Sequence, residues 1–228
     1  MVDLTASTQS DLAELVNASV AKSGEVITAE FQSAGRGRLD RSFEAPPESA
    51  LLFSFFLKPK RARSDWSFIS FLAAMAMHEV ISKDIADKVS LKWPNDILIG
   101  ERKVAGLLAQ QIGDGVIVGI GLNVAMNEIE LPVPTATSLA LSGSNNLDRN
   151  TLLFNVLNRL ESVYAEWESG ADFLEKYHQI SSTLGRQVRV EVLGRDPIEA
   201  EAVAITAQGA LILRDGFEVN VGDVVHLR

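Results

Sequence analysis

The sequence contains no cysteine among its 228 residues. This absence excludes a disulfide framework, catalysis by a thiolate and a zinc ribbon with cysteine ligands. Histidine is also scarce: His78, His178 and His226 lie far apart along the chain and show no metal-ligand spacing. We interpret all three as ordinary structural or surface residues.

Long apolar runs and a basic N-terminal start are missing too. The densest apolar stretches, residues 50–57 and 68–77, reach about half of the roughly 20 residues that a membrane span requires. Asp3 and Asp11 lie in the first eleven residues, which do not resemble a secretory signal. We therefore expect a cytoplasmic protein with no membrane partner.

The charge balance disfavours nucleic acid as a partner. The formal net charge is −9, so a polyanion would have to bind a local basic patch against the overall field. Hydrophobic residues make up 46% of the chain and charged residues 22%, which is ordinary for a globular protein. We expect a compact fold and no nucleic-acid partner.

Hydrophobic periodicity and turn residues predict an α+β fold. The pattern predicts a helix from Ser7 or Thr8 to Gly24, and it includes Val20 on the apolar face of that helix. Further strands are predicted at residues 25–31, 50–57, 89–93, 96–99, 104–111 and 116–124, and further helices at 66–85, 151–168 and 171–178. The short spacings favour a mixed or antiparallel sheet over repeated parallel units.

The pattern of predicted elements changes near residue 181. Short alternating strands, separated by turns that contain glycine, follow from there to the end. We therefore predict two domains, a larger one at residues 1–180 with helices packed on a mixed sheet, and a small barrel-like one at residues 181–228.

A long loop at residues 32–49 concentrates positive charge in an acidic chain. It holds three arginines and two glycines within seven residues: Gly35, Arg36, Gly37, Arg38 and Arg41. Arginine binds phosphate or carboxylate oxygens in pairs, and glycine lets backbone N–H groups approach an anion. The loop is predicted to bind an anion; the alternative is a solvated turn whose arginines pair with Asp40 and Glu44.

A second polar group lies between two predicted strands. Residues 92–96, with the sequence KWPND, are followed seven residues after Asp96 by Lys103, and these side-chain types suit a nucleotide and its magnesium ion. On spacing alone, the simpler interpretation is that Asn95 and Asp96 only form the turn that Pro94 begins. No standard nucleotide fingerprint is present, because there is no G-x-x-x-x-G-K and both glycine-rich segments lack the third glycine of G-x-G-x-x-G.

The motifs together resemble those of biotin protein ligases. They are STQ at 7–9, QSAGRGR at 32–38, KWPND at 92–96, KVAG at 103–106 and GIGLNV at 119–124, with LDRNTL at 147–152 and QGALIL at 208–213 in agreement. The resemblance runs from about residue 5 to the end. Only six residues precede STQ, so the chain resembles the short type, without the N-terminal DNA-binding domain of longer members.

The resemblance implies a fold, an activity and partners. The fold would be a biotin/lipoate ligase-like catalytic domain, related to class II aminoacyl-tRNA synthetases, followed by an SH3-like β-barrel. The enzyme would use ATP and Mg²⁺ to activate biotin as biotinyl-5'-AMP, and would transfer biotin to a lysine of the biotin carboxyl carrier domain of a biotin-dependent carboxylase. The carrier's identity and the choice between monomer and homodimer stay open.

The resemblance also implies roles for individual residues. Biotin would be bound by Ser7, Thr8, Gln9, Gln32, Gly35, Arg36, Gly37, Arg38, Lys103, Gly106 and Gly121. ATP would be bound by Arg36, Arg38, Phe43, Asn95, Asp96, Lys103 and Asn123. Lys103, Arg36 and Arg38 would be the catalytic residues, and Asp96 would contact Mg²⁺.

Two positions depart from the family's usual pattern. The family usually continues GRGR with R-x-W, whereas this chain has Arg41, Ser42 and Phe43, and it usually has Asn at the position of Gln9. Phenylalanine can stack on adenine but lacks the indole N–H. These departures bear on affinity and not on the class of reaction.

Three alternative functions are considered. A lipoate ligase or octanoyltransferase would attach a different carboxylic acid to a carrier lysine, although GRGR and KWPND together argue against it. A non-catalytic adaptor would bind a partner through the C-terminal region, although Lys103 and the arginines are retained. A nucleic-acid binder would use the arginine loop, with affinity that falls steeply with salt.

Overall fold

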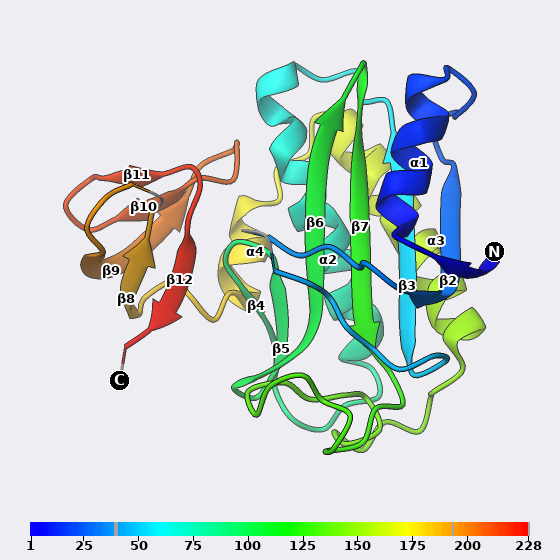
Figure 1. Cartoon of the computed structure of the whole chain (residues 1–228). Helices are drawn as coiled ribbons and strands as arrows, with labels where there is room; N and C mark the ends of the chain where they lie inside the picture. Colours follow the sequence, from blue (N-terminus) through cyan, green and yellow to red (C-terminus); the bar gives the residue numbers. More distant parts are fainter. Residues whose placement is uncertain (39–40, 193, 228) are drawn as a thin grey trace.

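The computed structural model describes residues 1–38, 41–192 and 194–227, and in that part of the chain it contains a seven-stranded and a five-stranded sheet (Figure 1). The larger sheet has the strand order β1-β2-β3-β7-β6-β5-β4. Its strands are β1 (Val2–Thr5), β2 (Val26–Gln32), β3 (Ala50–Leu57), β4 (Val89–Lys92), β5 (Asp96–Ile99), β6 (Arg102–Ile112) and β7 (Gly115–Asn123). β1 pairs with β2 in parallel and the other neighbours are antiparallel, so the sheet is mixed as expected.

The smaller sheet lies at the C-terminal end and is antiparallel, with the order β11-β10-β9-β8-β12. Its strands are β8 (Gln187–Glu191), β9 (Ile198–Ile205), β10 (Leu211–Leu213), β11 (Glu218–Val219) and β12 (Asp223–His226). The predicted fold class is therefore confirmed as a mixed sheet with helices and a second antiparallel sheet. The division into domains at residues 180 and 181 stays a prediction.

Helices cover the two faces of the larger sheet unequally (Figure 1). They are α1 (Thr8–Asn17), the 3-10 helix η1 (Arg63–Phe68), α2 (Ile69–Ile81), α3 (Arg149–Glu168) and α4 (Leu174–Ile180). α2 and α3 pack together behind the sheet in Figure 1, and α2 is apolar on nearly all sides because it is buried between α3 and the strands. α1 lies in front and packs on β2, β3 and β7, so the neighbouring part of that face is free of helices.

Several boundaries differ from the sequence predictions, and three differences have a clear physical reason or change the type of element. α1 ends at Asn17 and not at Gly24, because Ser19 has a φ of 59° that no α-helix accommodates, and Val20 is 63% exposed instead of facing the core. The predicted helix at 66–85 begins as a 3-10 turn, and its α-helical part ends at Ile81. β1 was missed because it is a short, mostly exposed edge strand without a buried face.

The two sheets are joined where the chain leaves α4. The backbone N–H of Ser182 donates to the carbonyl of Leu91 at 2.8 Å, and Leu91 forms a parallel bridge with Ser181. The chain thereby adds a short parallel partner to β4, the edge strand of the larger sheet. The C-terminal sheet is thus attached beside the turn that carries KWPND.

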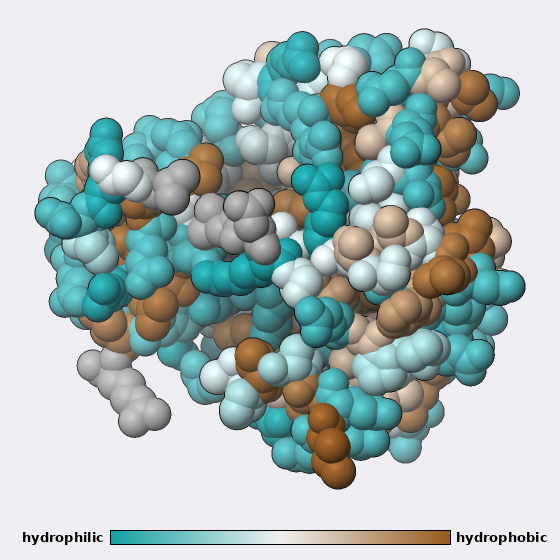
Figure 2. All heavy atoms as spheres, in the orientation of Figure 1, coloured by the Kyte–Doolittle hydropathy of each residue, from teal (hydrophilic) through white to brown (hydrophobic). Residues whose placement is uncertain are grey.

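The surface gives no indication of a membrane-spanning segment. Within the described ranges, no helix combines the length and the apolar character needed to cross a bilayer. Figure 2 shows mainly hydrophilic residues on the face seen in Figure 1, with smaller apolar areas scattered among them.

Candidate active site

A cavity of about 900 Å³, counting its open mouth, lies on the face of the larger sheet that α1 leaves uncovered. Its walls come from the arginine loop, the KWPND turn and the start of β12 in the C-terminal sheet. The cavity is lined by these predicted site residues: Ser7, Thr8, Gln9, Gln32, Arg36, Gly37, Arg38, Phe43, Asn95, Asp96, Lys103, Gly106 and Gly121.

Two glycines of β7 form part of the cavity floor. Side chains alternate between the faces of a strand, so Val118 and Leu122 point into the core and are fully buried, while Gly119 and Gly121 face the cavity. A Cβ atom at Gly121 would lie 2.5 Å from the ring of Phe43, which occupies the space that this glycine provides. Glycine is therefore required here for close packing of the loop on the floor.

A β-bulge places Lys103 and Gly106 on the same face of β6. Residues three apart in a regular strand point to opposite faces. Here Asp96 pairs with Gly106 and Leu98 pairs with Lys103, because the register shifts by one residue between these pairs. The Nζ atom of Lys103 consequently lies 2.6 Å from Oδ1 of Asp96 and 3.0 Å from the Cβ position at Gly106.

At the other end of the cavity, buried polar side chains are fixed by hydrogen bonds. Oε1 of Gln32 accepts from the backbone N–H of Thr8 at 2.8 Å and from its hydroxyl at 3.1 Å, and that hydroxyl is 2.8 Å from the Ser54 hydroxyl. Gln9 is 4% exposed and donates from Nε2 to the carbonyl of Leu108 at 3.2 Å. The extra methylene of Gln9 therefore spans to β6, and α1, β2 and β3 together present a preorganised polar cluster.

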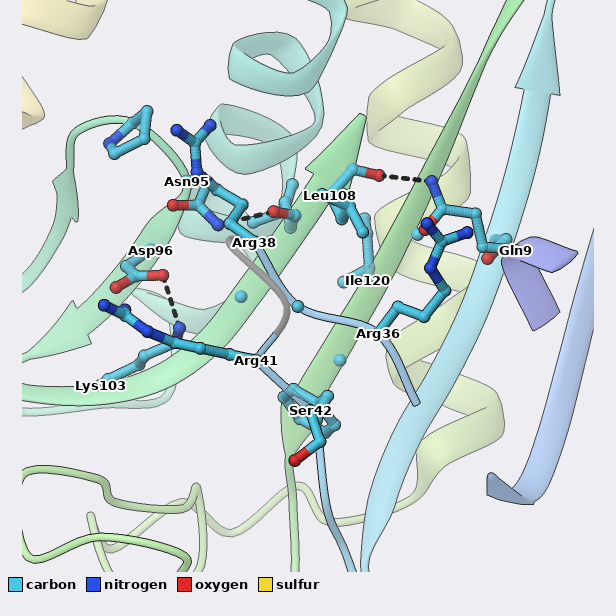
Figure 3. Close-up of a pocket in the computed structure, with 18 of the residues that line it drawn as sticks. Gln9, Arg36, Arg38, Arg41, Ser42, Asn95, Asp96, Lys103, Leu108 and Ile120 are labelled. Atoms are coloured by element: carbon cyan, nitrogen blue, oxygen red, sulfur yellow. Dashed lines mark hydrogen bonds and ion pairs between the residues drawn. The ribbon is translucent and has the colours of Figure 1, made fainter. Parts of the chain in front are cut away.

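The arginine loop folds back on itself through its glycines. The N–H of Phe43 donates to the carbonyl of Gly35 at 2.9 Å, and the N–H of Gly37 donates to the carbonyl of Arg41 at 2.7 Å. A Cβ at Gly35 would lie 2.3 Å from the carbonyl oxygen of Phe43. In Figure 3, Arg36 extends from this loop toward Gln9, whereas Arg41 extends in the opposite direction, toward the side of Asp96 and Lys103.

Two of the loop arginines are held by the C-terminal sheet. Nη2 of Arg38 donates to the carbonyl of Gly222 at 3.0 Å, and Arg41 forms an ion pair of 2.5 Å with Asp223. Burial lowers the pKa of Arg38, and the carboxylates of Asp223 and Asp96 oppose that shift, so its charge is sustained by two acidic neighbours. Positive charge is thus already ordered at the cavity.

This arrangement bears on the alternative of a solvated turn. In the described part of the loop, Glu44 accepts a hydrogen bond of 2.6 Å from the Ser42 hydroxyl, and Arg41 pairs with Asp223. Asp40, the other predicted partner, lies outside the described residues. Arg41 has therefore a long-range partner, and the loop docks on the C-terminal sheet.

The KWPND segment is both a turn and a wall of the cavity. Residues 93–95 form the turn between β4 and β5, as the simpler interpretation predicted, and yet all five residues line the cavity. Nδ2 of Asn95 donates to the carbonyl of Leu107 at 2.8 Å, which fixes the direction of its side chain (Figure 3). Asn95, Asp96 and Lys103 therefore form one rigid group across β5 and β6.

Two predicted residues lie outside the cavity lining. Gly35 is in the base of the loop, where it allows the close approach of Phe43. Asn123 is 5% exposed at the end of β7, and its Nδ2 donates to the carbonyl of Thr137 at 2.9 Å. The backbone around Thr137 pairs with the backbone of Lys103. The hydrogen bond from Asn123 therefore stabilises the segment that lies next to this lysine.

Other lining residues were missed by sequence reasoning. Ser54 had a signal, since it is the single polar residue in the apolar strand ALLFSFFL. The pattern around Leu108 and Ile120 indicated only core residues. Asp223 lies 100 positions from Asn123, the nearest predicted site residue, and further from all the others. No local pattern could have joined Asp223 to the loop.

His226 is a half-buried histidine with an altered pKa. Burial lowers its pKa to about 4, and the cations Lys92 and Arg186 act in the same direction. The folded protein therefore binds this proton more weakly than the unfolded chain, whose histidine titrates near 6.5. The stability that neutral His226 contributes is complete above about pH 6.5 and is lost as the pH falls toward 4.

We expect His226→Gln to flatten this pH dependence. Between pH 6.5 and 4, the free energy of unfolding should fall less steeply in the variant than in the unmodified protein, as measured by urea denaturation at a series of pH values. His178→Gln is the matched control, because His178 is exposed and its replacement should leave the slope unchanged. Equal slopes for His226→Gln and the unmodified protein would show that His226 is not the source of this pH dependence.

A metal ion would have few protein ligands here. Considering only the residues with described positions, no group of three His, Asp or Glu side chains is arranged to hold a metal ion. Asp96, which is 21% exposed at its side chain, is a single carboxylate facing the cavity. That donor set fits Mg²⁺, which usually takes one or two carboxylates and completes its shell with water and nucleotide phosphates.

Comparisons with known proteins agree with this architecture. Residues 1–127 match the model of the Biotin/lipoate A/B protein ligase family, and residues 183–227 match that of the Biotin protein ligase C terminal domain. The chain is 35% identical to a biotin--[acetyl-CoA-carboxylase] ligase of Mycobacterium tuberculosis, covering 100% of this chain and 88% of that protein. It is 34% identical to the bifunctional ligase/repressor BirA of Escherichia coli, covering 86% of this chain but 63% of that protein.

Solved structures include a close match in fold. The biotin protein ligase from Aquifex aeolicus in complex with biotin and ATP superposes with a TM-score of 0.83 at 29% identity, covering 100% of this chain and 97% of that one. The overall arrangement of both sheets is therefore shared with a structure that binds these two ligands.

Proposed function

This chain belongs to the biotin protein ligase family, and from that premise we propose that it activates biotin as biotinyl-5'-AMP and transfers it to a carrier lysine. The acceptor is proposed to be the biotin carboxyl carrier domain of a biotin-dependent carboxylase. The observation that carries the proposal is the convergence of Lys103, Asp96 and the arginine loop on one cavity that has a separate, neutral polar end.

The polar end would bind the head of biotin. A ureido ring has both donors and an acceptor, which match the hydroxyls of Ser7 and Thr8 and the Nε2 of Gln32. Oε1 of Gln32 is already occupied by Thr8, so its amide is oriented with Nε2 as the remaining donor. Gln9, Gly106 and Gly121 would border the ring and the aliphatic tail.

The cationic end would hold the reacting groups. A biotin carboxylate oxygen attacks the α-phosphorus of ATP, the bond from that phosphorus to the bridging oxygen breaks, and pyrophosphate leaves. Two anions must come together for this step, and Lys103, Arg36 and Arg38 would place fixed positive charge between them. Lys103 would bridge the carboxylate and the α-phosphate, while its partner Asp96 keeps it oriented.

The nucleotide would lie on the KWPND side of the cavity. Phe43 would stack on adenine, and Asn95 and Asp96 would face the phosphates, with Asn123 supporting the nucleotide side from outside the lining. Asp96 would also contact Mg²⁺, which when bound neutralises part of the phosphate charge.

In the second step, the acceptor lysine attacks the carbonyl carbon of the adenylate as a neutral amine. The bond from that carbon to the phosphate oxygen breaks, AMP leaves, and the amine loses one proton to form the amide. Folding of the loop over the adenylate would keep water from the anhydride.

The proposal is tested by biotin-dependent exchange of labelled pyrophosphate into ATP. We expect exchange with biotin and little with lipoate, because the polar end matches a ureido ring, which lipoate lacks. Exchange with lipoate alone would favour the lipoate ligase alternative, and exchange with neither acid would favour the adaptor. Transfer of labelled biotin to a purified carrier domain completes the test.

A nucleic-acid role is not part of the proposal. The net charge of −9 opposes polyanions, and Arg38 and Arg41 are engaged by the C-terminal sheet. Binding to duplex DNA that weakens steeply between low and high salt would speak for it.

We expect Phe43→Ala to weaken ATP binding while leaving biotin binding intact. Loss of a stacked aromatic ring should raise the KM for ATP about 10-fold, in line with the usual strength of base stacking. The measurement is the ATP dependence of biotin-dependent exchange. Phe154→Ala is the control, because Phe154 is 66% exposed on α3. An unchanged KM in the Phe43 variant would place adenine elsewhere.

A further inference from the structure

The turn that carries the nucleotide side of the cavity is held by the C-terminal region through Trp93. This residue lines the cavity and is 2% exposed. Its backbone N–H donates to Oγ1 of Thr183 at 3.0 Å, and its indole N–H donates to the carbonyl of Gly209 at 2.9 Å. Both acceptors lie about a hundred residues further along the chain, so the local sequence of KWPND alone does not fix its conformation.

Thr183 connects this turn to β12. The threonine is fully buried, and its Oγ1 lies 3.1 Å from Nε2 of His226. A hydroxyl has one proton and two lone pairs, so it can donate to a neutral imidazole and accept from the Trp93 N–H at the same time. Burial lowers the pKa of His226 to about 4, so the imidazole is neutral near pH 7, and in the tautomer with its proton on Nδ1 the Nε2 atom accepts from the Thr183 hydroxyl.

Neighbouring contacts fix the position of Thr183 itself. The N–H and the hydroxyl of Ser182 donate to the carbonyl of Leu91 at 2.8 and 3.2 Å, and Ser181 pairs with Leu91 beside β4. Directly before β12, Gly222 accepts the hydrogen bond from Arg38 through its carbonyl. Thr183 therefore lies at the junction of the turn, the edge of the larger sheet and the strand that holds the loop.

We propose that Thr183 is a positioning residue for the nucleotide side of the site, acting through the backbone N–H of Trp93. Asn95 and Asp96 follow Trp93 by two and three residues, and their side chains are aligned to Leu107 and Lys103 at 2.8 and 2.6 Å. Without its acceptor, the buried N–H of Trp93 has to reach another partner, and the turn must shift to allow this. The inference rests on the proposed function, since it concerns how ATP is bound.

The biotin side provides an internal reference. Thr8, Gln32 and Ser54 are carried by α1, β2 and β3, and among the hydrogen bonds of residues 1–38, 41–192 and 194–227 none joins them to Thr183. A change at Thr183 should consequently weaken the binding of ATP and leave the binding of biotin unchanged.

The experiment compares Thr183→Val, which has nearly the same shape but no hydroxyl, with Thr183→Ser, which keeps the hydroxyl. We expect Thr183→Val to raise the KM for ATP about 10-fold, and Thr183→Ser to stay within about threefold of the unmodified protein. The Kd for biotin, measured by calorimetry, should change by less than about twofold in both variants, as it does not depend on this hydrogen bond.

Leu213→Ala controls for loss of stability. Leu213 is fully buried in the C-terminal sheet, so its truncation lowers the melting temperature without removing either hydrogen-bond acceptor of Trp93. An unchanged KM for ATP in Thr183→Val, or an equal rise in Leu213→Ala, would overturn the inference. If Thr183→Val does not fold, His226→Leu removes the acceptor of the Thr183 hydroxyl and should raise the KM for ATP about threefold, and an unchanged value would likewise overturn it.

The two proposals fail separately. Absence of biotin-dependent exchange in the unmodified protein would remove the proposed function. Normal exchange in that protein, with an unaltered KM for ATP in the folded Thr183 variant, would remove only the role of Thr183.

Discussion

Lys103→Ala should lower the rate of biotin-dependent pyrophosphate exchange by about 100- to 1,000-fold, the usual effect of removing one preorganised group that stabilises developing charge. The expectation follows from the position of Lys103, whose ammonium faces the cavity beside Asp96 at 2.6 Å and is 40% exposed. Its removal takes away a cation between two anions and leaves the Asp96 carboxylate to repel the phosphates. Exchange rates at saturating biotin and ATP measure this effect.

Lys58→Ala is the matched control for that result. Lys58 pairs with Asp114 at 3.1 Å on the surface, outside the cavity lining, and its loss should leave exchange within about twofold because exposed ion pairs contribute little. The Lys103 variant should still bind biotin by calorimetry, which shows that it is folded. Full exchange activity in Lys103→Ala would refute the catalytic assignment of this lysine.

Gln32→Leu should weaken biotin binding about 50-fold, which corresponds to the roughly 1–3 kcal/mol lost when buried polar groups are left without a partner. Oε1 of Gln32 accepts two hydrogen bonds from Thr8, at 2.8 and 3.1 Å. Leucine is of similar size but removes this acceptor and the Nε2 donor proposed for the ureido ring. Calorimetric titration with biotin gives the Kd directly.

Gln179→Leu serves as the control, because Gln179 is exposed on α4 and its side chain bonds within its own helix, to Glu175. Its Kd for biotin should equal that of the unmodified protein. A Kd for Gln32→Leu within about twofold of that value would place the ureido ring at another part of the cavity, since so small a change is less than one hydrogen bond.

Elements defined by local patterns were predicted well. The continuous apolar run at residues 50–57 matches β3 residue for residue, and the strand at residues 96–99 matches β5. The strand predicted at residues 116–124 matches β7 to within one residue at each end. These elements are determined by residues that are close in the sequence, so the local hydrophobic pattern is enough to predict them.

Features that depend on tertiary contacts were not predictable. The bulge in β6 reverses the direction expected for Lys103 relative to Gly106, and nothing in the residues of KVAG demands it. The docking of Arg41 on Asp223 joins residues 182 positions apart (223 − 41 = 182), and the hydroxyl of Thr183 reaches a backbone group 90 positions away. The motifs therefore indicated most of the residues that line the cavity, whereas the geometry of the cavity comes from the packing of the two sheets.

The most direct measurement is mass spectrometry of the small molecules bound after the purified protein is incubated with biotin, ATP and Mg²⁺. In the proposed mechanism, the cations of the loop and Lys103 act on both substrates at once when the acid–phosphate bond forms. The account predicts biotinyl-5'-AMP in about one equivalent per chain, since one cavity holds it, and its absence from Lys103→Ala. Recovery of unreacted biotin and ATP alone from the unmodified protein would contradict the account.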